Sequence, residues 1–226
     1  GSLAVDPWAR STIDRLLYSS ETISAIPATL SSIYISNHHF GNVDKSFFIA
    51  GQTPAGVTNV AEKLTHSTET ISAAPSANST VNRRRAAAAG NQTYGYLSGG
   101  TSPLTSITDK CNLATETTAR EPSADLPFSN GSIAASGNST QLYVGGGPSV
   151  NGTSVYKFTF SSDTYSAAVG ANLAVDQAQN TSTSSSSGGY FTSGYNPASP
   201  NGITDIDKIN SNSHVYKNTV TALKCK

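Results

Sequence analysis

Residues 83–122 read RRRAAAAGNQTYGYLSGGTSPLTSITDKCNLATETTAREP and hold one complete copy of a unit that recurs along the chain. In this copy an acidic, a basic and an apolar residue follow one another at 109–111, and Glu116 and Thr117 stand six and seven residues after the lysine. The basic position of this motif occurs five times, at intervals of 48, 47, 47 and 51 residues. Its five occupants are Arg15, Lys63, Lys110, Lys157 and Lys208.

A second column lies six residues beyond the basic position and places an acid before a threonine. It is kept in four copies, as Glu21, Glu69, Glu116 and Asp163, and it breaks in the fifth, where His214 and Val215 stand. The acid of the first motif is lost only in the fourth copy, where Tyr156 replaces it. Two columns that keep register over four copies indicate an internal repeat of about 47 residues.

Each copy offers four short strand candidates, separated by turn-forming pairs such as Asn151-Gly152. The clearest alternation is VYKFTF at 155–160, where three aromatic side chains share one face of a strand. A four-stranded unit of this length cannot bury both faces alone, and radial stacking of such units gives a β-propeller. The alanine-rich segments 86–90 and 133–137 suit the innermost strand, where blades converge. We therefore predict an all-β fold with one propeller domain over residues 1–226.

The ends of the chain decide how the ring closes. Complete copies span residues 34–75, 83–122, 130–168 and 178–223. The chain begins with a pair of outer strands at 12–26 that has no inner strands before it. A half-blade of this kind would leave strand edges exposed. We predict that both termini complete this blade, with residues 3–5 as its second strand and part of 220–224 as its innermost strand. The predicted ring has five blades.

The composition restricts the classes of molecule that the chain is expected to bind. The chain has 14 Lys and Arg against 14 Asp and Glu, so it lacks the excess positive charge that non-specific binding to nucleic acid or to an anionic membrane requires. It has no apolar run near the roughly 20 residues of a membrane helix, and because no charged and then apolar stretch opens it, we expect no signal peptide. It lacks Met and begins Gly1-Ser2, which predicts a domain taken from a longer protein.

The acidic-basic pairs are candidates for chemistry, but neighbouring residues of a strand point to opposite faces and cannot form one catalytic pair. We predict that they pair across strands or between blades instead. His38 and His39 are splayed in the same way, and Cys111 and Cys225 lack metal-ligand spacing. Because no nucleophile elbow or nucleotide-binding loop is present either, we predict a protein that is not an enzyme and has no catalytic residue, metal or cofactor.

The candidate binding residues are Arg83, Arg84 and Arg85, with His38 and His39 as weaker candidates. The three arginines are the one concentrated charge and precede an innermost strand. They either grip a sulfated or phosphorylated glycan or an acidic partner through bidentate contacts, or form a solvated edge. Six Asn-x-Ser/Thr sequons are either glycosylation sites or the chance product of a chain rich in these residues; they begin at Asn78, Asn91, Asn130, Asn138, Asn151 and Asn180.

The motif at 94–100, YGYLSGG, preceded by Ala-Ala-x-Gly-Asn, and the pattern Ile-x-Asp-Lys/Arg-x-x-x-Ser-x-Glu-Thr resemble kelch-like repeats of tail and other virion proteins of phages, notably phages of cyanobacteria. The resemblance covers nearly the whole chain. It implies a virion-associated, extracellular domain that binds a host-surface glycan or another virion protein. The alternatives are a secreted lectin with a site in each blade and, third, a hydrolase or oxidase.

Two copies depart from the ideal repeat at the innermost strand. The first complete copy has YISNHHF at 34–40 where an alanine segment is expected, and the fourth has STSSSS at 182–187. These copies are either the places where binding has diverged or degenerate repeats.

Overall fold

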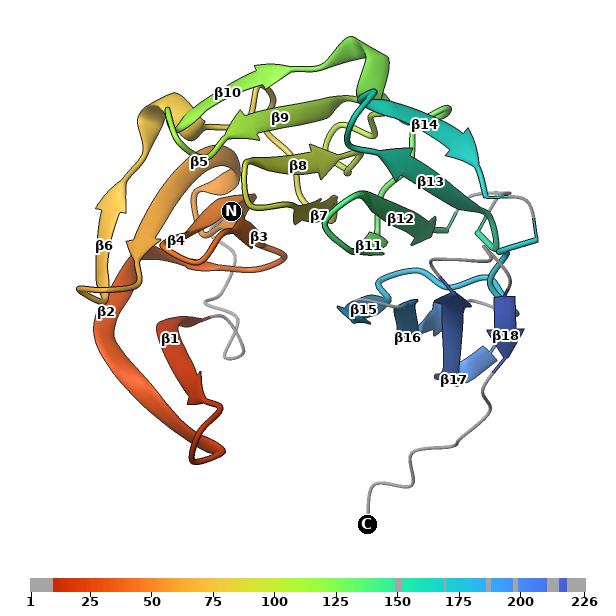
Figure 1. Cartoon of the computed structure of the whole chain (residues 1–226), viewed down its shortest axis with the longest axis horizontal. Helices are drawn as coiled ribbons and strands as arrows, with labels where there is room; N and C mark the ends of the chain where they lie inside the picture. The colour runs from red at the N-terminus through yellow and green to blue at the C-terminus, as the bar shows by residue number, and fades with distance from the viewer. Residues whose placement is uncertain are drawn as a thin grey trace.

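The fold is described from a computed structural model, which describes residues 10–148, 152–168, 170–185, 188–196, 199–210 and 216–218. Four antiparallel sheets of four strands each form a β-propeller arrangement of four blades (Figure 1). Blade A consists of β3 (His38–Gly41), β4 (Lys45–Thr53), β5 (Gly56–Thr65) and β6 (Thr70–Ala73). Blade B consists of β7 (Ala87–Gly90), β8 (Tyr94–Ser98), β9 (Thr108–Asn112) and β10 (Thr117–Arg120).

Blade C consists of β11 (Ile133–Gly137), β12 (Gln141–Gly146), β13 (Val155–Thr159) and β14 (Thr164–Ala167). Blade D consists of β15 (Thr181–Ser185), β16 (Gly188–Asn196), β17 (Ser199–Asn210) and β18 (Tyr216–Asn218). In every blade the strands pair in chain order, and the first strand lies nearest the centre of the arc (Figure 1). The predicted all-β fold and its four complete repeats are confirmed.

The N-terminal strands form a separate two-stranded sheet, the N-terminal hairpin. It consists of β1 (Arg10–Leu17) and β2 (Thr22–Tyr34), so the predicted pair at 12–26 exists but its second strand continues to Tyr34. The arc is open between β1 and blade D (Figure 1). The predicted closing segments, residues 3–5 and 220–224, lie outside the described residues, and the described chain has four complete blades rather than five.

Gly-Asn pairs build the turn between the first two strands of blades A, B and C. The side-chain Oδ1 of Asn91 accepts hydrogen bonds from the main-chain N–H groups of Thr93 and Tyr94, both at 2.8 Å, and Asn42 and Asn138 accept equivalent pairs. A Cβ on Gly90 would lie 2.4 Å from the carbonyl oxygen of Tyr94, so a side chain does not fit there. The turn therefore requires both residues of the repeated Gly-Asn pair.

The second repeated turn joins the outer two strands. Glu21, Glu69, Glu116 and Asp163 all adopt left-handed backbone conformations, with φ between 50° and 57°. Hydroxyl groups on either side of each acid hydrogen-bond to each other at 2.7 to 2.8 Å, as Thr115 does with Thr117. In three of the four copies, the acid of this turn pairs with a basic residue of the preceding sheet.

The hydrophobic core lies between blades. Phe47 and Ile49 of blade A pack with Leu97 and Cys111 of blade B, and corresponding clusters join blade B to C and blade C to D. The first strands contact one another across consecutive blades. Small residues such as Ala87 and Ala134 permit that approach, as predicted for the innermost strand.

Candidate functional site

The acid of the repeated motif holds the segment that leads into its own blade. Asp109 of β9 accepts hydrogen bonds from the Ser79 hydroxyl and from the Thr80 main-chain N–H, both at 2.8 Å. Glu62 does the same for the end of β2, through the N–H of Ser31 at 2.9 Å and the hydroxyl of Tyr34 at 3.3 Å. These carboxylates are buried and serve the connections between blades.

Blade D has the same contact between the motif carboxylate and the connection before the blade, whereas blade C has an aromatic contact at this position. Asp207 accepts hydrogen bonds from the N–H of Ala174 at 3.2 Å and from Gln177 at 3.3 Å. Tyr156 stands at the acid position of blade C, where its ring packs edge-on against Phe128 with centroids 5.3 Å apart. An aromatic contact thus takes the place of the carboxylate in the copy that lost its acid.

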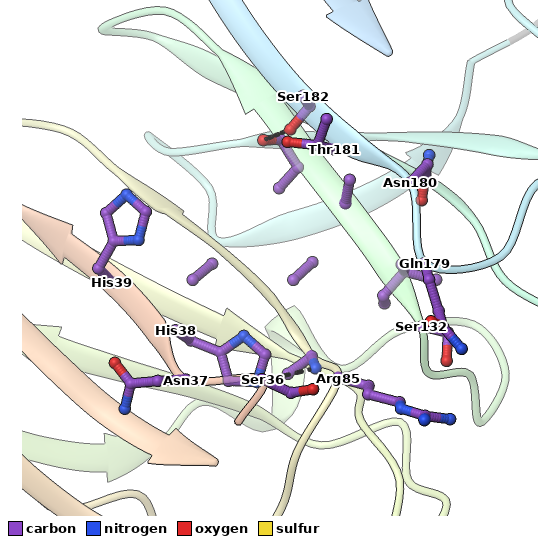
Figure 2. Close-up of a pocket in the computed structure, with 16 residues that line it drawn as sticks. Ser36, Asn37, His38, His39, Arg85, Ser132, Gln179, Asn180, Thr181 and Ser182 are labelled. Carbon is purple, nitrogen blue, oxygen red and sulfur yellow. Dashed lines mark hydrogen bonds between the residues drawn. The ribbon is translucent and has the colours of Figure 1, made fainter. Parts of the chain in front are cut away.

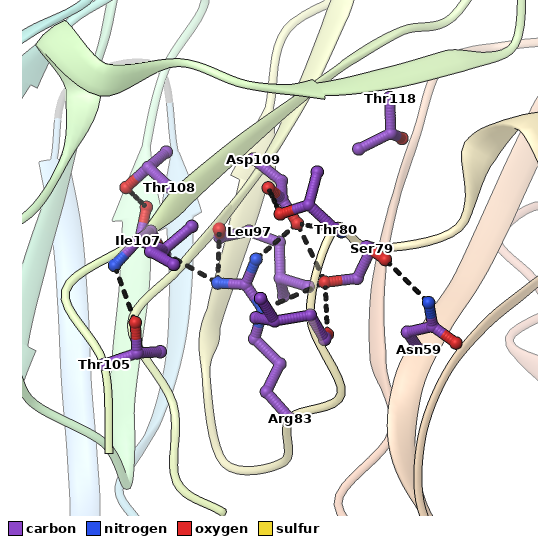
Figure 3. Close-up of polar contacts among 12 residues, drawn as sticks. Asn59, Ser79, Thr80, Arg83, Leu97, Thr105, Ile107, Thr108, Asp109 and Thr118 are labelled. Carbon is purple, nitrogen blue, oxygen red and sulfur yellow. Dashed lines mark hydrogen bonds and ion pairs between the residues drawn. The ribbon is translucent and has the colours of Figure 1, made fainter. Parts of the chain in front are cut away.

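Arg83 completes the network around Asp109 (Figure 3). Its side chain is fully buried, forms an ion pair with Asp109, and donates to the carbonyls of Leu97, Gly99 and Ile107 at 2.8 to 3.2 Å. Burial lowers the pKa of Arg83, and the charge of Asp109 opposes that shift. The guanidinium is fully occupied within blade B and does not reach a binding surface.

In the first three copies, the basic residue of the motif points the other way and binds the following blade. Lys63 of blade A pairs with Glu116 of blade B at 2.9 Å, and Lys45 reaches the same carboxylate at 2.7 Å. Hydrogen bonds from Lys45 and Lys63 lower the pKa of Glu116. Lys110 of blade B pairs with Asp163 of blade C in the same way. Arg15 joins the N-terminal hairpin to Glu69 of blade A.

A pocket of about 420 Å³ lies where the four first strands begin (Figure 2). It is lined by residues 36–39, 85–88, 132–135 and 179–182, one segment from each blade. Figure 2 shows their polar side chains around an open centre. The segments of blades B and C contribute mainly alanine, whereas those of blades A and D contribute polar side chains. The two copies with irregular first strands are therefore the polar walls of one pocket.

The same backbone conformation begins all four segments. Ser36, Arg85, Ser132 and Gln179 are left-handed, with φ between 55° and 59°. The N–H of Ser132 donates to the carbonyl of Arg85 at 2.6 Å, and the N–H of Gln179 donates to the carbonyl of Ser132 at 2.9 Å. Main-chain hydrogen bonds between blades thus fix the rim of the pocket.

His38 belongs to the pocket wall and is held there by a main-chain hydrogen bond. Its Nε2 accepts a hydrogen bond from the N–H of Ala86 at 3.1 Å, which requires the neutral imidazole. Burial, together with the nearby charge of Arg83, lowers the pKa of His38 to about 3. His39 points to the other side and is exposed at the pocket.

The predicted binding residues therefore lie in different surroundings. Arg83 is inside blade B, and Arg84 hydrogen-bonds to Gln52 of blade A. Of the three arginines, only Arg85 lines the pocket, together with both histidines. The three arginines do not form one cationic surface.

Sequence reasoning did not single out Gln179 or Thr181, which line the pocket from blade D, and it marked Asn180 beside them only as a sequon. The departure from the alanine pattern at 182–187, beside them, was the signal that could have found them. The Asn180 side chain is buried, and neither its amide nitrogen nor its amide oxygen has a hydrogen-bond partner in the part of the chain that the structure describes.

The sequon asparagines within the described residues mostly serve the fold. Asn130 is buried and donates to the carbonyl of Gly146 at 3.0 Å, while Asn91 and Asn138 form the turns described above. Asn151 and Cys225 lie outside the described residues, and Cys111 is a buried free thiol in the core between blades A and B.

No protein-family model matches the chain, and no curated protein matches it. Within the described residues, no cluster of three or more His, Cys, Asp or Glu side chains could hold a metal ion. In the same part of the chain, no helix is long and apolar enough to cross a membrane. The fold and the pocket thus define a β-propeller with one polar pocket shared by its blades.

Proposed function

We propose that the chain is a non-enzymatic binding domain of a virion, which attaches the particle to a glycan on the host surface. The observation that carries the proposal is that the polar side chains fall into two groups, one that stabilises the fold and one that lines the pocket. Charged side chains of the repeat, such as Asp109 and Lys110, hold connections and blades together. Hydrogen-bonding side chains without such a role, including His39 and Thr181, gather at the shared pocket.

The pocket suits a polyhydroxylated ligand. Its volume of about 420 Å³ lies within the range of small-molecule sites, roughly 300 to 1,000 Å³. Alanine side chains in blades B and C leave room, and amide and hydroxyl groups in blades A and D can donate and accept hydrogen bonds. The virion setting and an extracellular location rest on the resemblance to phage repeats. Attachment to another virion protein is the second form of the same proposal.

The competing functions predict other arrangements. A secreted lectin with a site in each blade would bind several equivalent ligands, whereas this pocket is shared by four blades and favours one ligand per domain. A hydrolase would need converging carboxylates, but Glu62, Asp109 and Asp207 are buried in three different blades with hydrogen bonds to their own connections. The geometry therefore favours binding over catalysis.

We also propose that the ring closes to five blades, with the two ends of the chain completing the N-terminal hairpin. The apolar residue of the motif packs on the preceding blade: Cys111 and Phe158 are at most 1% exposed. Leu16 at the same position is 48% exposed, because no described blade precedes the hairpin. If blade D covered Leu16, the apolar residue of the motif would be buried here as it is in blades B and C.

The ion pairs between blades predict which residues of blade D and of the N-terminal hairpin would meet in a closed ring. Arg15, Lys63 and Lys110 each pair with the acid of the following blade, so Lys208 of blade D should pair with Glu21 of the N-terminal hairpin. Glu21 has the left-handed turn conformation of its counterparts, with φ of 52°, and no ion-pair partner in the described part of the chain. Closure would give it one.

The function is tested by titrating the purified domain against a glycan array and against intact cyanobacterial cells, with periodate-treated cells as the control for glycan dependence. The proposal predicts saturable binding at one site per domain, lost after periodate treatment, with the glycan recovered intact. Several equivalent sites would favour the multivalent lectin, and a shortened glycan would establish a hydrolase. Absence of binding to every glycan and to cells would contradict glycan attachment.

A further inference from the structure

We propose that the shared pocket recognises an acidic sugar unit of that glycan, with Arg85 binding its carboxylate. The proposal rests on glycan binding as the function of the domain and adds the class of sugar and the residues that select it. Among the described residues, no Asp or Glu lines the pocket, and Arg85 is the permanently charged side chain of its lining. The pocket is therefore electrostatically suited to an anion.

Arg85 is available for this role. Arg83 and Arg84 are engaged by Asp109 and Gln52, whereas the structure shows neither an ion pair nor a side-chain hydrogen bond for the Arg85 guanidinium within the described residues. Its main chain is held at the rim by the hydrogen bond from Ser132. A planar guanidinium on a fixed backbone can bind a carboxylate through two parallel hydrogen bonds.

Neutral groups around the pocket can bind the sugar hydroxyls. Gln179 and Thr181 of blade D and His39 of blade A are exposed and line the same pocket. Within the described residues, none of the three has a side-chain hydrogen bond that would compete with a ligand. An amide, a hydroxyl and an imidazole each both donate and accept, which matches a sugar ring with several hydroxyls.

Asn180 is a second sign that the wall of blade D is incomplete without a ligand. Buried amide groups normally have hydrogen-bond partners, because leaving one unpaired destabilises the fold. The equivalent Asn37 of blade A donates to the carbonyl of Ala50 at 2.8 Å, whereas Asn180 has neither a donor nor an acceptor partner among the described residues. The pocket also exceeds what one small inorganic anion would fill, which favours a sugar over an isolated oxyanion.

The test is a calorimetric or NMR titration of the whole chain with glucuronic and galacturonic acid, with glucose and galactose as neutral counterparts and inorganic sulfate as the anion alone. The uronic acids should bind at least tenfold more tightly than the neutral sugars and than sulfate. Arg85→Gln should abolish that preference, and Thr181→Val, which keeps the shape, should weaken binding severalfold. Arg120→Gln, which alters an exposed arginine paired with Asp125, is the matched control and should bind like the wild type.

The outcomes separate this inference from the proposed function. Equal affinity for neutral and acidic sugars, or uronic acid binding that Arg85→Gln leaves unchanged in a folded protein, would overturn the inference while glycan binding stands. Sulfate binding as tightly as the uronic acids would reduce the site to a simple anion site and also overturn it. Failure to bind any sugar or host glycan would instead overturn the proposed function. Circular dichroism of each variant establishes that it is folded.

Discussion

Lys110 of β9 forms an ion pair with Asp163 in the turn between β13 and β14, and so joins blade B to blade C. The Lys110 ammonium also lies 4.1 Å from the ring centre of Tyr94 in its own blade. The pair recurs as Lys63 with Glu116 one repeat earlier. The basic and acidic columns of the repeat are thus the two halves of a single contact between neighbouring blades.

Removal of the buried acid should be the most damaging change to the repeat. Asp109→Asn leaves the fully buried Arg83 without its counter-ion, and breaking such a pair typically costs about 3 to 5 kcal/mol. We expect a loss of that size in the free energy of unfolding, measured by urea denaturation at pH 7. Arg120→Gln, at an exposed ion pair, should leave the unfolding midpoint close to that of the wild type. Equal behaviour of the two variants would contradict the structural role of Asp109.

The contact between blades at Glu116 should contribute less, with a defined pH dependence. Its pKa is lowered in the fold, so its contribution to stability is present above the ordinary value of 4.5 and is lost as pH falls through the folded pKa. Because the carboxylate is partly exposed, Glu116→Gln should cost on the order of 0.2 to 1 kcal/mol at neutral pH. The difference from the wild type should shrink in acid, as followed by urea unfolding from pH 7 to pH 3. A difference that grows in acid would contradict this account.

His38 should make the fold sensitive to acid in a different range. Its folded pKa of about 3 lies below the ordinary 6.5, so the unfolded chain takes up a proton first as pH falls below 6.5. The wild type should lose about 2 kcal/mol through this group between pH 7 and pH 5. His38→Ala, which introduces the alanine that blades B and C have in this strand, should flatten that part of the profile. An NMR titration showing a His38 imidazole that protonates near pH 6.5 would contradict it.

Much of this organisation could be predicted from the sequence because it is periodic. The spacing of the basic residues predicted four complete blades, and strand alternation predicted that an acid and its neighbouring base cannot form one catalytic pair. Periodicity also marked 34–40 and 182–187 as irregular, and residues 36–39 and Ser182 of these segments line the pocket.

The functions of individual arginines could not be predicted in the same way. Nothing local distinguishes Arg83 from Arg85, and their separation depends on Asp109, 26 residues along the chain from Arg83. The continuation of β2 to Tyr34 was not predicted either, because it depends on long-range pairing, of Thr29 with Thr12 and of Tyr34 with Arg10.

The exposed leucine of the N-terminal hairpin gives an independent test of closure. If blade D covers Leu16 as preceding blades cover Cys111 and Phe158, Leu16→Ala should destabilise the chain by about 2 to 5 kcal/mol, as for a buried leucine. Tyr18→Ala, at a residue that is 87% exposed in the hairpin turn, is the control and should change little. Urea unfolding of both variants gives the comparison, and a Leu16→Ala variant as stable as the control would indicate an open arc.

The most direct test of the five-bladed ring is the distance between Glu21 and Lys208, measured by pulsed electron paramagnetic resonance on spin labels attached to Glu21→Cys and Lys208→Cys. Cys225→Ser removes the native thiol near the C-terminus. A second doubly labelled variant, Lys110→Cys with Asp163→Cys, reports the equivalent contact between blades B and C. A closed ring predicts that the two distance distributions overlap. A Glu21 to Lys208 distribution centred at a much longer distance than that of the Lys110 and Asp163 labels would contradict closure.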